Sequence, residues 1–117
     1  MGKSRAVSKA RAELFEVIFP LMKAMYDEFS ELSKKKPEAA LNKAKVSTVN
    51  RLLLKCKELL DGEPSLAFLD QLDETMIPQN SDVVLCLSQY VAAMKQFQSK
   101  YSDSDIVGNP EWNTRGS

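Results

Sequence analysis

VVLCLSQYVAAMKQFQSKY, residues 83–101, is the stretch that decides the fold. Its apolar side chains recur every three or four positions and occupy a helical face about 120° wide, which is the strongest periodic signal in the chain. A helix with such a face packs against a core on one side and meets water on the other, so we expect a core helix that starts near Asn80 or Ser81. The face consists of Val83, Leu87, Tyr90, Val91, Met94, Phe97 and Tyr101.

Two other long stretches show helical periodicity. The first runs from about Ser4 to Lys34 with its stripe at Val7, Leu14, Ile18, Leu21, Met25, Phe29 and Leu32. Pro20 lies opposite the centre of this stripe, so we expect a kink there that bends the helix around the core. The second begins near Pro37 or near Lys45, two alternatives that the pattern leaves open, and carries Val46, Val49, Leu52, Leu53, Cys56, Leu59 and Leu60.

A short helix is expected from Pro64 to near Asp73, because proline suits the first turn of a helix. These segments predict an all-α fold, an antiparallel helical bundle of three long helices and one short helix, in a single domain of residues 1–101. The periodicity ends at Ser102, so residues 102–117 are expected to form a flexible C-terminal tail. Trp112 lies in this tail, where its indole either docks on the domain or contacts a partner.

The composition excludes several chemistries. The chain of 117 residues has no histidine, which removes His-containing triads and zinc sites, and Gly62 is the only glycine between residues 3 and 107, which removes phosphate-binding glycine loops. Cys56 and Cys86 have no metal-site spacing and are expected to be core thiols. We therefore expect no enzyme activity, no cofactor and no metal.

Neither a secretory signal nor a membrane-spanning stretch is recognisable. Arg11, Glu13 and Glu16 interrupt the apolar run that a signal peptide needs, and no uncharged run approaches the roughly 18 residues that cross a bilayer. The sequence therefore predicts a cytoplasmic protein that makes no membrane contact.

The net charge is zero, but the charges are segregated along the chain. Residues 12–33 hold five acidic residues and one lysine, residues 34–57 hold eight basic residues and one glutamate, and residues 58–82 hold seven acidic residues and no basic one. Two interpretations stay open: neighbouring helices neutralise one another, or the surface is bipolar and attracts a charged partner. Glu28 and Lys45 lie at or within the apolar sectors of their helices, so we expect them to form a buried pair.

These features favour a non-enzymatic interaction module, a small adaptor, regulator or immunity-type protein that binds another protein. The alternative is a nucleic-acid-binding regulator that uses the basic segment 34–57, with Asn50 and Arg51 as candidate base contacts. Phe19 and Tyr26 widen the apolar face of the first helix, so we also expect self-association, as in a homodimer. The candidate partner-binding residues are Lys34, Lys35, Lys36, Lys43, Arg51, Lys55, Phe19, Tyr26 and Trp112.

Overall fold

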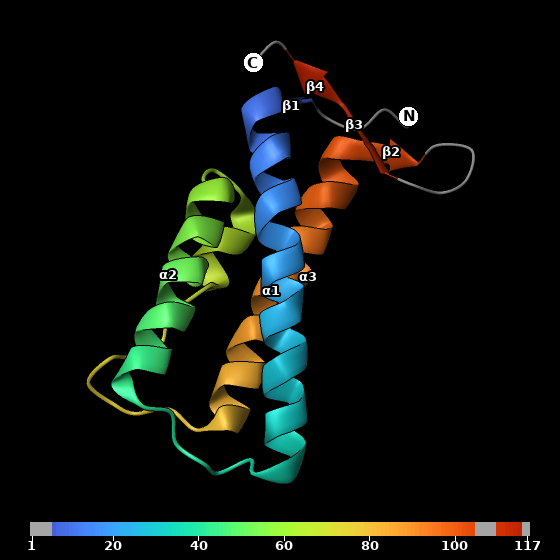
Figure 1. Cartoon of the computed structure of the whole chain (residues 1–117). Helices are drawn as coiled ribbons and strands as arrows, with labels where there is room; N and C mark the ends of the chain where they lie inside the picture. The colour runs from blue at the N-terminus through green and yellow to red at the C-terminus, as the bar shows by residue number, and fades with distance from the viewer. Residues whose placement is uncertain (1–5, 105–109, 116–117) are drawn as a thin grey trace.

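Three long helices make up most of the structure, a computed structural model that describes residues 6–104 and 110–115. Their bounds are α1 (Lys9–Lys35), α2 (Lys43–Leu59) and α3 (Asn80–Tyr101) (Figure 1). The prediction of a mainly helical fold is confirmed. The expected short helix is a single 3-10 segment, Pro64–Phe68, which ends five residues before Asp73 and leaves Phe68 77% exposed.

The chain returns between α2 and α3 through a segment that is mostly not helical. In Figure 1, α1 descends and α2 ascends, after which residues 60–79 carry the chain back down, so that α3 ascends beside α1. α3 is thus parallel to α2 and antiparallel to α1. What differs from the expected bundle is the fourth helix, because the returning segment is helical only at the 3-10 turn Pro64–Phe68 and residues 69–79 contain no helix.

The core lies mainly between α1 and α3, which pack against each other more extensively than either packs against α2. All seven positions predicted for the apolar face of α3 are buried. From α1, Phe15, Ile18, Met22 and Phe29 face them, and Phe15 stacks on Phe97 with ring centroids 5.9 Å apart. α2 adds Val46, Val49, Leu53, Cys56 and Leu59.

α1 begins later than expected and is not broken. Val7 and Ser8 form strand β1 (Val7–Ser8), and the Ser8 side chain caps the helix by accepting a hydrogen bond from the Arg11 amide at 3.2 Å. The helix then runs through the exposed Pro20 to Lys35. At the start of α2, the Asn42 side chain accepts a hydrogen bond from the Lys45 amide at 2.8 Å. The second helix therefore begins at Lys43, near the later of the two expected starts, and residues 37–42 form a loop.

The C-terminal segment has secondary structure that its sequence pattern did not suggest. Strand β4 (Thr114–Arg115) pairs in parallel with β1, and β2 (Ser102–Ser104) pairs antiparallel with β3 (Pro110–Trp112). Trp112 packs its ring edge-on against Phe15, with centroids 4.9 Å apart, and donates from Nε1 to Glu16 at 2.6 Å. The indole therefore docks on the end of the domain where α1 starts.

Replacing the buried Leu87 by alanine should lower the free energy of unfolding by about 2–5 kcal/mol, because the packed core closes only partly around the lost methyl groups. The matched control is Leu85→Ala on the same helix, where the side chain is 64% exposed, and this change should stay within about 0.5 kcal/mol of the parent. Equilibrium urea unfolding measures both. Equal losses for the two variants would show that α3 does not face the core as described.

Candidate functional site

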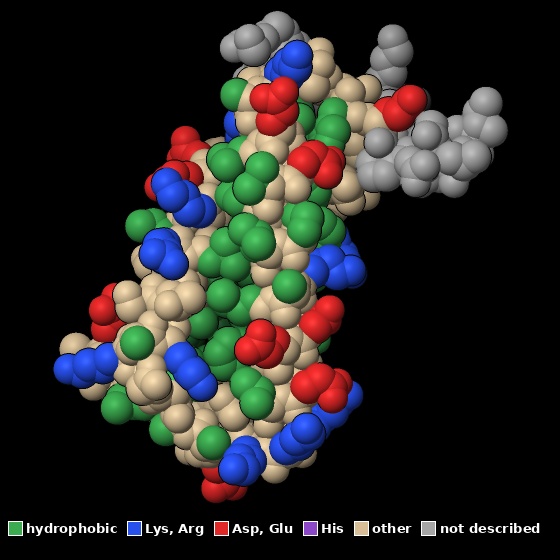
Figure 2. Space-filling model, in the orientation of Figure 1, with side chains coloured by type: hydrophobic (Ala, Val, Ile, Leu, Met, Phe, Trp, Pro, Cys, Tyr) green, Lys and Arg blue, Asp and Glu red, His purple; other side chains and the backbone are tan. Residues whose placement is uncertain are grey.

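A groove of about 810 Å³ lies between the second half of α1 and the first three turns of α2. α1 contributes residues from Leu21 to Leu32, and α2 contributes residues from Ala44 to Lys55, with Asn42 from the preceding loop. Each wall therefore runs for about three helical turns, roughly 16 Å at 1.5 Å per residue. Figure 2 shows apolar side chains gathered in the space between the two helices.

The floor of the groove is apolar and partly open to water. Phe29 and Val49 are buried at its base, and Met25 and Leu52 are half-buried. Leu21 is 54% exposed and Leu32 38% exposed, although the sequence pattern assigned both to the core stripe of the first helix. That assignment was wrong because α2 does not cover this side of α1 along its second half, so the apolar stripe continues into a groove.

Charged residues line both walls. Lys45, Arg51 and Lys55 lie on α2, and Glu28 lies on α1, all four exposed. The expected buried pair of Glu28 and Lys45 is therefore not formed. The two side chains line the same groove from opposite walls, and no ion pair within 4.0 Å joins α1 to α2 among residues 6–104 and 110–115.

The other candidate binding residues lie elsewhere. Lys34, Lys35, Lys36 and Lys43 are exposed near the loop between α1 and α2, outside the groove lining. Phe19 and Tyr26, expected to be surplus apolar surface, are half-buried and pack against the core.

Asn50 is not a surface residue, contrary to its place among the candidate base contacts. It is 5% exposed, its amide nitrogen donates to the Leu72 carbonyl at 2.9 Å, and its Oδ1 accepts from the Leu72 amide at 2.8 Å. This pair of bonds fixes the extended segment 69–73 against α2. A role in base recognition is incompatible with these contacts because both ends of the carboxamide are used.

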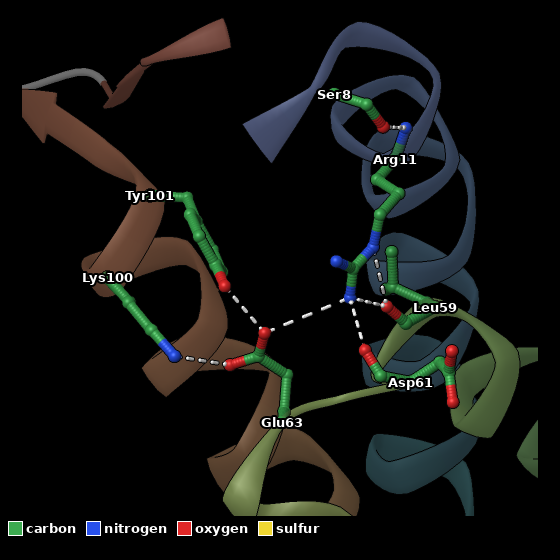
Figure 3. A network of polar contacts seen from close by, with 7 residues as sticks. All are labelled: Ser8, Arg11, Leu59, Asp61, Glu63, Lys100 and Tyr101. Atoms are coloured by element: carbon green, nitrogen blue, oxygen red, sulfur yellow. Dashed lines mark hydrogen bonds and ion pairs between the residues drawn. The ribbon is translucent and has the colours of Figure 1, made fainter. Parts of the chain in front are cut away.

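A second polar cluster surrounds Glu63 at the other end of α2 (Figure 3). Tyr101 donates to the Glu63 carboxylate at 2.6 Å, and Lys100 donates to it at 3.0 Å. Arg11 donates to the carbonyls of Leu59 and Asp61, each at 3.1 Å, and its guanidinium lies 3.9 Å from Glu63. The cluster thus joins α1, the end of α2 and the end of α3.

The Glu63 side chain is only 8% exposed. Its burial alone would raise the carboxyl pKa, but the hydrogen bonds from Tyr101 and Lys100 and the positive charges of Lys100 and Arg11 outweigh burial, so the pKa lies below its ordinary value. The hydrogen bond to Glu63 likewise raises the pKa of Lys100. Because every group here is engaged by a neighbour, the cluster serves to hold the helices together.

The two cysteines do not form a reactive site. Cys56 is buried, and burial raises the pKa of its thiol to about 12. Burial, with a smaller effect of the Asp70 charge, raises the pKa of the Cys86 thiol to about 11. At neutral pH both thiols are protonated and therefore poor nucleophiles.

In the described ranges, no group of three or more side chains is arranged to hold a metal ion, and no helix is long and apolar enough to cross a membrane. Comparisons with protein-family models, with curated proteins and with solved structures found no match. The groove between α1 and α2 is therefore the candidate functional site on geometric grounds alone.

Glu63→Gln should lower the free energy of unfolding at neutral pH by about 1–3 kcal/mol, because the variant loses charge-assisted hydrogen bonds in a nearly buried position. A carboxyl whose pKa is lowered on folding stabilises the fold above its ordinary pKa, near 4.5, and this contribution is lost as the pH falls toward the folded value. The difference between parent and variant should therefore shrink below about pH 4.5 in urea unfolding measured from pH 7 to 3.

The control for this experiment is Glu58→Gln, which removes an exposed ion pair with Lys55 at 3.6 Å. Such pairs contribute only about 0–1 kcal/mol, so this variant should stay close to the parent at pH 7. A difference between parent and Glu63→Gln that stays constant down to pH 3 would contradict the lowered pKa.

Proposed function

We propose that the protein is a non-enzymatic interaction module that binds an amphipathic helix of another protein in the groove between α1 and α2. The observation that supports this proposal is the shape of the groove, two helical walls of equal length above an apolar floor. A helix of about three turns matches this length and completes a bundle that α2 leaves open along one half of α1.

The apolar side chains of the floor supply the binding energy in this proposal. Leu21 and Leu32 keep apolar surface in water in the free protein, and an apolar stripe on a partner helix would remove it. Full burial of a leucine side chain is worth about 1.5–3 kcal/mol, part of which offsets the loss of freedom on binding. Helix-in-groove recognition uses this arrangement, with anchors at every third or fourth position of the bound helix.

Two observations favour a protein partner over the alternative of nucleic acid. Asn50 is committed to the Leu72 backbone, and the exposed bases Lys45, Arg51 and Lys55 stand beside an apolar floor on which a phosphate backbone would gain nothing. Homodimer formation remains a prediction from the sequence. A homodimer would fit the same proposal if a helix of the second copy occupied the groove.

Leu21→Lys should weaken groove binding at least about tenfold, because it places a charge where an apolar anchor must dock. The probe is the tightest binder from a displayed library of helical peptides with a varied apolar stripe and uncharged flanks. Affinity is measured by fluorescence anisotropy, and methyl NMR shifts of Leu21, Met25 and Leu52 report the place of binding. Leu85→Lys is the matched control, a leucine on α3 outside the groove that is 64% exposed against 54% for Leu21, and should bind as the parent does.

Three results would contradict the proposal. The library yields no binder, or its best binder retains full affinity for Leu21→Lys, or sodium dodecanoate shifts the same methyl signals at lower concentration than any peptide. The last result would make the groove a site for acyl chains.

A further inference from the structure

The two walls of the groove carry opposite charges. Figure 2 shows basic side chains on the α2 side of the apolar surface and acidic side chains along α1. The wall residues themselves are Lys45, Arg51 and Lys55 on α2 and Glu28 on α1. The basic segment 34–57 and the acidic segment 12–33 of the sequence therefore meet at this groove.

These charges are not consumed by contacts between the walls. Within residues 6–104 and 110–115, Glu28, Lys45 and Arg51 have no ion pair. Lys55 pairs only with Glu58 of its own helix, at 3.6 Å, and both side chains are more than half exposed. An exposed pair of this kind is weak, so Lys55 can exchange Glu58 for a partner at little cost.

The opposite charges restrict which helix the groove accepts and in which direction it lies. A bound helix must turn its apolar stripe to the floor, so its two flanks face the two walls. An acidic flank is attracted by Lys45, Arg51 and Lys55 and repelled by Glu28, and a basic flank experiences the reverse. Turning the helix end for end exchanges the flanks, which means that the charges also select one chain direction.

Building on the proposed function, we propose that the groove selects a partner helix with acidic side chains on the flank that faces α2 and basic side chains on the flank that faces α1. The apolar stripe gives affinity, and the flanks give specificity and direction. On a helix with uncharged flanks, only the packing of the apolar stripe sets the direction.

The test uses the peptide selected for the parent groove with uncharged flanks, remade in two charged forms. One form carries glutamate on the first flank and lysine on the second, and the other exchanges them. Because the selected stripe already packs in one direction, only one form matches the walls. The matched form should bind about three- to tenfold more tightly than the uncharged peptide, and the mismatched form more weakly, with both differences reduced at high salt.

A variant with exchanged wall charges, Glu28→Lys with Lys45→Glu and Lys55→Glu, should reverse this preference. All three side chains are exposed, so the fold should be retained, which circular dichroism checks. Lys95→Glu, an exposed charge reversal on α3 outside the groove, is the matched control and should leave the preference as it is in the parent.

The outcomes separate the two proposals. If the two charged forms bind the parent within twofold of each other, or if the exchanged walls leave the preference unchanged, the charge selection is wrong while groove binding stands. If neither form nor the uncharged peptide shifts the methyl signals of Leu21 and Leu52, both proposals are wrong.

Discussion

The packing of α1 against α3 is the constraint on which the rest of the structure depends. Phe15 and Met22 of α1 and Tyr90 and Phe97 of α3 are almost completely buried, and together they form the centre of the core. Because α1 directs this face to α3, only its neighbouring stripe is left for α2. α2 packs onto the remaining surface with Val46, Val49, Leu53, Cys56 and Leu59 buried, and polar contacts add to its placement.

Two polar contacts fix α2 to its neighbours, one at its C-terminal end and one near its middle. Arg11 bonds to the carbonyls of Leu59 and Asp61, where the helix ends, and thus satisfies acceptors that have no partner within the helix. Asn50 holds the extended segment through Leu72 on the side away from the groove. Val46 and Val49 of α2 are buried, whereas Leu21 and Leu32 of α1 remain exposed, so α2 covers the apolar stripe of α1 only in part. The groove follows from this partial cover.

Hydrophobic periodicity predicted the buried residues of a helix well where the rest of the fold covers its whole apolar face. Every predicted face residue of α3 is buried, from Val83 to Tyr101. The same method misplaced Leu21 and Leu32, because a hydrophobic pattern shows which side of a helix is apolar and does not show whether another helix reaches it. It also predicted a short helix from Pro64 to near Asp73, where the structure has a 3-10 segment, Pro64–Phe68, followed by residues 69–79 without a helix.

Long-range polar contacts were the other part that the sequence did not reveal. The bonds of Asn50 to Leu72 and of Glu63 to Tyr101 join residues 22 and 38 positions apart, so no local signal marks them. Of the candidate site residues, Arg51 and Lys55 line the groove, whereas Phe19 and Tyr26 pack against the core. The sequence predicted that Glu28 and Lys45 lie on facing sides of their helices, and both line the groove. Their side chains do not pair, because the groove separates the two helices at this point.

A double-mutant cycle between Glu28 and Lys45 tests the open groove most directly. Glu28→Gln, Lys45→Gln and the double variant are compared in urea unfolding at low ionic strength, and the coupling free energy is the part that the single changes do not account for. Side chains on separate walls should give a coupling within about 0.5 kcal/mol of zero. A favourable coupling above about 1 kcal/mol would show that the walls close and the two charges pair in the free protein, and it would contradict the account of the groove as a binding site.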